Sequence, residues 1–353
     1  MDKNFWKSRK VFLTGHTGFK GSWLSLWLLS MGAKVCGYAQ APATEPSLYS
    51  ALALDGEMQS VLGDIRDLEA LERALQTFRP DVVLHMAAQP LVRYSYQHPV
   101  ETYEVNVLGT VHLLEAVRRT SGVRAVVSVT SDKCYENREW PWPYRENEAM
   151  GGHDPYSSSK GCAELVTAAY RRSFFHAEGA ATVATARAGN VIGGGDWAED
   201  RLVPDIIRAF TRKESVIVRN PAAVRPWQHV LEPLSGYLAL AENLCTEGRG
   251  FEGGWNFGPS DADAQPVSHL VARMSELWGD GAAWRVESQA AVHEAHLLRL
   301  DSSKARAMMH WRPRWRLDEA LEKTVEWYKG FYAGQEARAM TLRQIEQYAQ
   351  AEK

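Results

Sequence analysis

A strand, a glycine-rich turn and a helix follow one another between residues 11 and 31, and no other stretch restricts the possible folds as much. The run Val11-Phe12-Leu13-Thr14 is typical of a buried parallel strand, and an apolar helical run extends from Ser22 to Met31. Between them stand Gly15, Gly18 and Gly21, with Thr17 and Phe19 in the same turn. In this context the first glycine allows a tight turn, the second admits a pyrophosphate and the third lets the helix pack on the strand. These five residues therefore predict a dinucleotide held at a helix N-terminus.

Strand and helix patterns alternate as far as residue 188. Further strands are predicted at residues 34–38, 61–64, 82–88, 124–130 and 182–187, with helices at 67–77, 102–120 and 155–175. This alternation predicts an α/β fold, a Rossmann-type doubly wound parallel sheet. We assign residues 1–188 to a dinucleotide-binding domain and residues 189–353 mainly to a smaller α+β C-terminal substrate-binding lobe, with the chain returning to the first domain near residues 228–258. A last helix is predicted at 317–332, and the charged tail after Gln335 is expected to form an extra arm.

The composition excludes several classes of protein. A formal net charge of −3 provides no basic field for nucleic acid or an anionic membrane. The four cysteines are scattered without CxxC spacing, so we expect neither a metal site nor a disulfide framework. No apolar run is long enough to span a membrane and no secretory signal is present, which predicts a cytoplasmic protein.

Polar residues that could carry redox chemistry follow the strand predicted at 124–130. Ser131, Asp132 and Lys133 come at its end, and Tyr156 and Lys160 lie four residues apart at the start of a helix, so both face one way. A tyrosine can take the proton of a sugar hydroxyl during hydride transfer if its pKa falls from about 10 toward 7, which corresponds to roughly 4 kcal/mol. A lysine ammonium and a positive nicotinamide ring can together supply that stabilisation in a closed site. A YxxxK pair alone is common by chance, but here it follows the glycine turn and a strand that ends in Ser131.

Longer blocks of sequence show a family resemblance. The chain resembles the extended short-chain dehydrogenases/reductases that act on nucleotide sugars, most closely the 4,6-dehydratases of CDP-glucose. The blocks that carry the resemblance are TGHTGFKGSWLSLW (14–27), HMAAQPLVRY (85–94), TSDKCY (130–135), YRENEAMGGHDPYSSSKGCAE (144–164), RAGNVIGGGDW (187–197), RPWQHVLEPL (225–234) and WNFGPSD (255–261).

The resemblance implies NAD as a cofactor that is bound and regenerated. It implies that Asp64 and Ile65 lie at the edge of the adenine, and that Ala87 and Ala88 leave room for the cofactor. It also implies that Asn106 lies near the catalytic residues. Tyr156 and Lys160 are expected to contact the cofactor as well. One departure is that Gly37-Tyr38 stands where an acidic residue for the adenosine ribose is expected. No arginine stands at that position to bind a 2′-phosphate, so NAD is expected rather than NADP.

A 4,6-dehydratase must remove the C5 proton and expel the C6 hydroxyl, which requires an acid and a base beyond the tyrosine. Related dTDP-glucose dehydratases carry Asp-Glu where this chain has Asp132-Lys133. By resemblance Asp132 is the acid toward O6. Lys133 is the C5 base if burial or nearby cations lower its pKa, and otherwise stabilises the enolate electrostatically.

The resemblance also implies substrate-binding and assembly features. Asn190, Arg201, Arg225, His229 and Asn256 are the expected substrate-binding residues. His293 and His296 stand where relatives have a phosphate-binding arginine, which leaves their role open. The helices at 102–120 and 155–175 are expected to form a helix-bundle interface of a homodimer or homotetramer.

Three functions remain in competition at this point. The first is the dehydratase, placed by the resemblance in deoxysugar biosynthesis for surface polysaccharide such as O-antigen, and acting on CDP-glucose or on another nucleotide-glucose. The second is a nucleotide-sugar 4-epimerase, which leaves Asp132 and Lys133 without a task. The third is a non-catalytic dinucleotide-sensing regulator, which has little need of Ser131, Tyr156 and Lys160 together.

Overall fold

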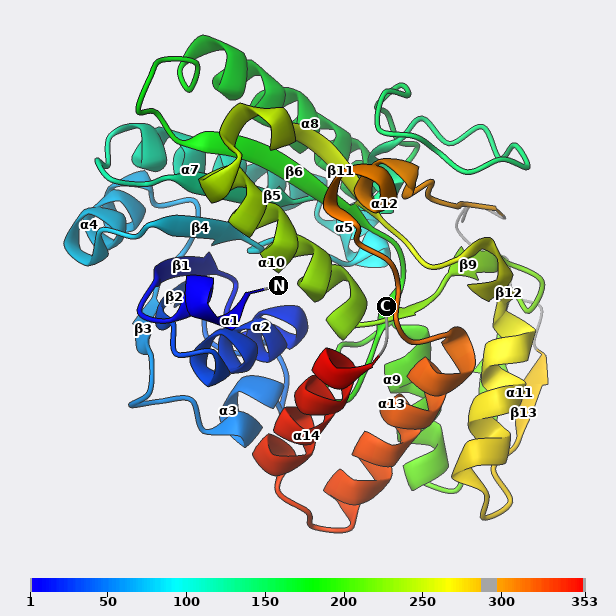
Figure 1. The fold of residues 1–353 in the computed structure, drawn as a ribbon. Helices are drawn as coiled ribbons and strands as arrows, with labels where there is room; N and C mark the ends of the chain where they lie inside the picture. Colours follow the sequence, from blue (N-terminus) through cyan, green and yellow to red (C-terminus); the bar gives the residue numbers. More distant parts are fainter. Residues whose placement is uncertain (1, 287–296, 352–353) are drawn as a thin grey trace.

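The computed structural model describes residues 2–286 and 297–351. Its centre is a seven-stranded, entirely parallel sheet in the order β11-β6-β5-β4-β1-β2-β3. These strands are β1 (Lys10–Thr14), β2 (Lys34–Ala39), β3 (Gln59–Leu62), β4 (Val82–His85), β5 (Ala125–Val129), β6 (Thr182–Ala188) and β11 (Gly253–Phe257). The doubly wound parallel sheet predicted from the alternation of strands and helices is confirmed (Figure 1).

Helices cover both faces of the sheet because its strands carry apolar residues on both sides. In β1, Val11 and Leu13 belong to one hydrophobic cluster and Phe12 to another. The first cluster includes α2 (Phe19–Ser30) and α10 (Leu231–Thr246), and the second includes α4 (Leu68–Phe78), α7 (Gly109–Arg118) and part of α8 (Pro155–Ser173). Short elements complete this part of the chain: α1 (Lys3–Trp6), α3 (Leu48–Leu52), α5 (Val92–Gln97), α6 (Pro99–Tyr103), the π-helical turn η1 (Glu104–Leu108) and the 3₁₀ turn η2 (Asp132–Cys134).

The helix predicted at 102–120 is not continuous. It consists of α6, the π-helical turn η1 and α7, and Asn106 lies on the π-helical turn. Such wide turns recur at functional sites, because the extra residue re-aims the side chains on one face of the helix.

After β6 the chain leaves the sheet and then returns to it. The small elements that follow are β7 (Val191–Ile192), α9 (Leu202–Thr211), β8 (Val216–Val218), β9 (Val224–Pro226) and β10 (Gln228–His229), and after the return come η4 (Asp261–Asp263), β12 (Ala264–Pro266), α11 (Val267–Trp278) and β13 (Trp284–Val286). In between, α10 packs against β5 and β6, η3 (Gly248–Phe251) follows, and β11 pairs with β6. In Figure 1 the elements β9, β12, α11 and β13 lie together to one side of the sheet. The boundaries of two domains at residue 188 stay a prediction.

The C-terminal residues pack against the core of the molecule. After α12 (Ser303–Met309) and α13 (Leu317–Tyr332), the expected extra arm is the helix α14 (Ala337–Gln350), which contacts α2, α3 and α13. Its residues Met340, Ile345 and Tyr348 are buried. The charges that suggested an arm lie on the exposed side of this amphipathic helix, as expected for a helix with one apolar face.

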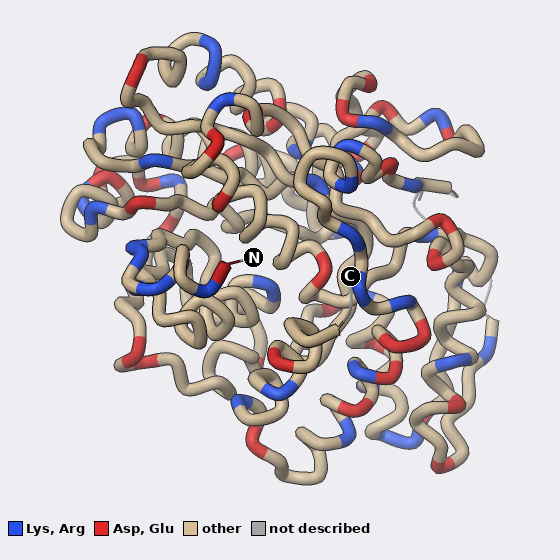
Figure 2. Tube along the Cα trace, in the orientation of Figure 1, with Lys and Arg blue, Asp and Glu red and all other residues tan. Residues whose placement is uncertain are grey.

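The distribution of charge and the helix lengths bear on partners. Acidic and basic residues are interspersed along the trace (Figure 2). Among the described residues no helix combines the length and apolar character needed to cross a lipid bilayer.

Candidate active site

The glycine turn leaves an open approach to the N-terminus of α2. Gly15 has φ +78°, and a Cβ there would lie 2.8 Å from the Ala87 main-chain nitrogen. A Cβ on Gly21 would lie 2.1 Å from the Gly15 carbonyl oxygen, so these two positions exclude any larger residue. Around Gly18, in contrast, the nearest such atom is 3.5 Å away, and Gly18 is the N-cap of α2 without a side-chain cap. Uncapped helical N–H groups at an open turn fit a pyrophosphate.

The loop that follows β4 is held against this turn. The Thr14 hydroxyl accepts hydrogen bonds from Met86 N at 3.0 Å and Ala87 N at 3.1 Å. This places Ala87 beside Gly15 of the glycine turn, and the contact of Ala87 and Ala88 with a dinucleotide stays a prediction.

Asn106 connects that loop to the helix that carries Tyr156. Its Oδ1 accepts from Gln89 N at 2.9 Å, and its Nδ2 donates to Ser159 Oγ at 2.9 Å and to Gln89 O at 3.1 Å. Asn106 is buried and fully occupied by protein partners. Asn106 therefore links η1, the loop after β4 and α8 through its hydrogen bonds.

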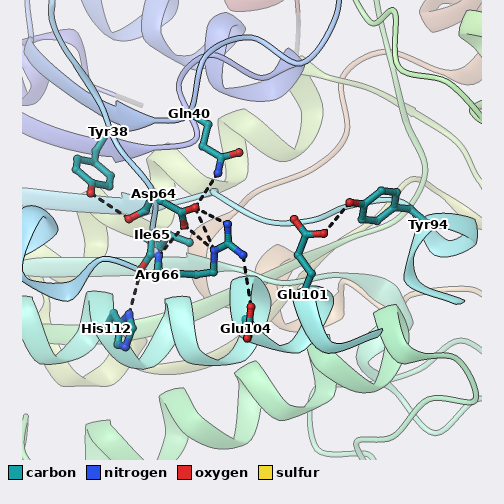
Figure 3. A network of polar contacts seen from close by, with 9 residues as sticks. All are labelled: Tyr38, Gln40, Asp64, Ile65, Arg66, Tyr94, Glu101, Glu104 and His112. Atoms are coloured by element: carbon teal, nitrogen blue, oxygen red, sulfur yellow. Dashed lines mark hydrogen bonds and ion pairs between the residues drawn. The ribbon is translucent and has the colours of Figure 1, made fainter. Parts of the chain in front are cut away.

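The predicted adenine edge is a dense polar network (Figure 3). Asp64 accepts hydrogen bonds from Arg66 and from Gln40 Nε2, the latter at 2.8 Å. Ile65 is buried behind this edge, and its carbonyl oxygen contacts His112 Nδ1 at 3.2 Å. Strand β2 ends at Ala39, one residue beyond the Gly37-Tyr38 pair taken as its end, so Ala39 and Gln40 occupy the strand end. No acidic residue stands there either.

The end of β5 and the first turn of α8 bring the catalytic candidates together. The Ser131 hydroxyl donates to Asp132 Oδ1 at 3.0 Å, accepts from Lys133 N at 3.2 Å and hydrogen-bonds the Tyr156 side chain. Asp132 is 1% exposed, and its Oδ2 is buried without a partner among the described residues. Lys133 is half-buried on the η2 turn. A carboxyl oxygen that is desolvated and has no protein partner is available to hydrogen-bond a ligand, since leaving it unused costs free energy.

Burial controls the protonation of this group. It raises the pKa of Tyr156 to about 12, against the opposing effects of the Ser131 hydrogen bond and of Arg201. It lowers the pKa of Lys160 to about 8. The expected decrease in the pKa of Tyr156 is therefore not supplied by the chain, and lowering it from 12 to 7 corresponds to roughly 7 kcal/mol.

Two residues that were not predicted face the same site. Lys20 lies in the first turn of α2, and its Nζ donates to the Tyr237 hydroxyl at 3.3 Å. Burial, and then the positive charges of Lys160 and Arg201, lower the pKa of Lys20 to about 7, with Asp132 opposing. Lys20 could have been noticed because it stands inside the glycine turn, whereas Tyr237 on α10 has no local sequence signal.

A buried ion pair supports the site from beneath. Arg187 on β6 and Glu164 on α8 are 2.7 Å apart, with both side chains 5% exposed. Glu164 also accepts from the hydroxyls of Thr130 and Thr185, and Arg187 donates to the Tyr135 hydroxyl. The pair therefore fixes α8, which carries Tyr156, against β5 and β6. Ser131 follows the end of β5.

Of the five predicted substrate residues, Arg201 lies within electrostatic range of Tyr156, and Asn190 has an unpaired polar atom. Arg201 lowers the pKa of Tyr156 and is itself held by Asp196 at 2.8 Å. Asn190 follows β6, and its Oδ1 is buried without a partner among the described residues. Both are placed to contact a ligand, although the contact itself stays a prediction.

The other three predicted substrate residues have protein surroundings. Arg225 on β9 is buried and donates to the Val224 carbonyl oxygen. His229 is fully buried against the rings of Trp23 and Trp315. Asn256 is fully buried too, and its amide is occupied by the Tyr135 hydroxyl and the carbonyl oxygens of Tyr144 and Asp301. The geometry favours structural roles for His229 and Asn256, and their contact with a nucleotide stays a prediction. His293 and His296 lie outside the described residues.

A glycine turn at the N-terminus of α2, with Ser131 after β5 and with Tyr156 and Lys160 on α8, defines the class of the extended short-chain dehydrogenases/reductases. Within this class, a family described as GDP-mannose 4,6-dehydratase matches residues 12–324. The chain belongs to this family.

Individual relatives agree with this assignment. The chain is 56% identical to a CDP-glucose 4,6-dehydratase of Salmonella typhimurium over 99% of both chains. Its fold is similar to that of MoeE5 solved with UDP-glucose and NAD (TM-score 0.77, 26% identity, covering 92% of this chain and 99% of that one). It is also similar to a dTDP-glucose 4,6-dehydratase of Bacillus anthracis solved with NAD (TM-score 0.76, 22% identity, covering 91% and 96%).

Proposed function

We propose that this protein is an NAD-dependent CDP-glucose 4,6-dehydratase, a hydro-lyase that converts CDP-glucose to CDP-4-keto-6-deoxyglucose and water. The observation that carries the proposal is the buried, unpaired Asp132 Oδ2 beside the Ser131 and Tyr156 side chains. A 4-epimerase requires no second acid, whereas water loss does. The 56% identity to the Salmonella typhimurium enzyme supports the choice of CDP-glucose.

The residues of the glycine turn fit NAD. Gly15, Thr17, Gly18, Phe19 and Gly21 would hold its pyrophosphate, with Ala87 and Ala88 on the adjacent loop. When bound, NAD supplies a hydride acceptor for sugar C4 and returns the hydride to C6, so that it is regenerated. Its positive ring is the charge that the buried Tyr156 lacks.

The side chains of the site then have separate tasks. Tyr156 takes the proton of the C4 hydroxyl, with Ser131 hydrogen-bonded to the phenol and Lys160 on the next turn of α8. Asp132 gives a proton to the departing C6 hydroxyl. Lys133 receives the C5 proton or stabilises the negative charge that develops when that proton leaves.

The activity is tested by incubating the protein with NAD and, separately, with CDP-, dTDP-, GDP- and UDP-glucose. We expect a 4-keto-6-deoxy product, detected by its alkaline absorbance, from CDP-glucose, and deuterium at C5 when the reaction runs in heavy water. A C4 epimer as the sole product would instead establish the epimerase. Turnover of another nucleotide-glucose but not of CDP-glucose would overturn the choice of base.

We further propose that the protein is a cytoplasmic homodimer or homotetramer that supplies deoxysugars for surface polysaccharide. Large apolar side chains are exposed on adjacent helices: Val100 (70%) on α6, Leu108 (49%) on η1 and Leu165 (61%) on α8. The segments α6, η1 and α7 all contact α8. Exposed apolar side chains on packed helices are typical of a helix-bundle interface between copies.

A Leu165→Glu variant is expected to shift the protein toward monomer, because it would bury a charge in that interface. Light scattering coupled to size-exclusion chromatography measures the mass at several concentrations. Leu62→Glu is the matched control, since Leu62 is similarly exposed (66%) but lies on the edge strand β3. An unchanged mass for Leu165→Glu, or an equal shift for Leu62→Glu, would contradict this interface.

A further inference from the structure

The strand end of β2 is built around an amide instead of a carboxylate. Gln40 follows Ala39, the last residue of β2. Its main-chain oxygen accepts from Thr17 Oγ1 at 2.9 Å, and its Nε2 donates to Asp64 Oδ2 at 2.8 Å. Gln40 thus connects the glycine turn to the loop after β3, the two segments that frame the predicted adenosine site. Figure 3 shows the contact between Gln40 and Asp64.

Asp64 determines how the Gln40 amide is oriented. An ionised carboxylate only accepts hydrogen bonds, so the amide nitrogen must face Asp64 and the amide oxygen must face away. Figure 3 shows Oε1 directed away from Asp64. No protein group among the described residues donates to Oε1, and the side chain is exposed. An oriented, unpaired acceptor at this strand end suits a ribose hydroxyl.

The charges around Gln40 oppose an additional phosphate. Arg66 shares Asp64 with Gln40, but its guanidinium is bound to Asp64 at 2.6 Å and to Glu104 at 3.4 Å. Glu101 also acts on Arg66 electrostatically. Two carboxylates therefore pair with one guanidinium and a third lies within electrostatic range, so these four groups together are net negative. A 2′-phosphate, which carries close to two negative charges, would be repelled there.

We propose that the Gln40 amide oxygen, oriented by Asp64, binds the adenosine ribose, and that the carboxylates around Arg66 exclude a 2′-phosphate. The chain would then select NAD over NADP without the usual strand-end carboxylate. The inference rests on the NAD dependence of the proposed function and assigns its selectivity to particular residues.

Titration calorimetry with NAD and with NADP tests the proposal without depending on turnover. The wild-type chain is expected to bind NAD more tightly than NADP. Gln40→Leu should weaken NAD binding roughly three- to tenfold, the range of one neutral hydrogen bond. Glu104→Gln should tighten NADP binding severalfold and change NAD binding less than twofold, because it removes one repulsive charge. Glu115→Gln removes the same charge from α7, where Glu115 pairs with Arg118, and should change neither affinity.

Each outcome has a definite meaning. Unchanged NAD affinity in Gln40→Leu would exclude Gln40 as the ribose ligand. Equal wild-type affinities for NAD and NADP, or NADP affinity unaffected by Glu104→Gln, would overturn the electrostatic selection. Failure of the wild-type chain to bind either dinucleotide would remove NAD from the proposed function, and this inference with it.

Discussion

A Tyr156→Phe variant is expected to lose roughly 10²–10⁴-fold in kcat, the usual contribution of a positioned proton acceptor. The phenol is buried at 8% exposure and hydrogen-bonded by Ser131, and no other side chain is assigned to the C4 hydroxyl proton. The change removes one oxygen atom, so folding and NAD binding should be preserved. Formation of the 4-keto-6-deoxy sugar measures turnover, and calorimetry measures NAD binding.

A Lys133→Met variant separates C4 oxidation from water loss, and it is compared with Tyr156→Phe. It should still oxidise C4 and accumulate reduced cofactor, seen by its near-ultraviolet absorbance, while water loss and C5 deuterium exchange decline. Tyr156→Phe should in addition prevent formation of the reduced cofactor. Full turnover in Tyr156→Phe would remove the phenol from hydride transfer, and full turnover in Lys133→Met would remove Lys133 from elimination.

An Arg187→Met variant is expected to lose about 3–5 kcal/mol of unfolding free energy. The substitution leaves the Glu164 carboxylate buried beneath the sheet without its cation, and both side chains are 5% exposed. Urea denaturation followed by circular dichroism measures the loss. Turnover should also decrease, because α8 is no longer held against β5 and β6.

The surface pair Arg118–Glu115 provides a matched control. Its N···O distance of 2.6 Å is close to the 2.7 Å of the buried pair, but the Arg118 side chain is 42% exposed. Arg118→Met is therefore expected to cost less than about 1 kcal/mol. The double variant Arg187→Met, Glu164→Leu should recover part of the loss, since no uncompensated charge remains. Equal losses of unfolding free energy in Arg187→Met and Arg118→Met would show that burial does not determine the contribution of the Arg187–Glu164 pair.

Much of the site was predictable because its residues occur in short, regular patterns. The strand, glycine turn and helix at residues 11–31 form one local unit, and its turn has the open N-terminus that the glycine spacing implies. Tyr156 and Lys160 are one helical turn apart on α8, and Ser131 comes two residues after the buried strand β5, so strand and helix patterns indicate both groups.

Two predictions about helices were less successful: the tail after Gln335 and the helix at 102–120. The charged tail after Gln335 is an amphipathic helix, and its apolar face is meaningful only against α2, α3 and α13. The helix predicted at 102–120 contains a π-helical turn, which aims Asn106 at Gln89 and Ser159 on other segments. Both features depend on contacts with distant residues, which periodicity does not encode.

The fold class, the glycine turn and the Ser131, Tyr156 and Lys160 set could be read from local sequence, because each follows from backbone sterics or from helical and strand periodicity. The protonation of Tyr156, the contact of Lys20 with Tyr237 and the orientation of the Gln40 amide arose only on folding. Desolvation and hydrogen bonding act between segments that are far apart in the chain, and their energies exist only once those segments are packed together.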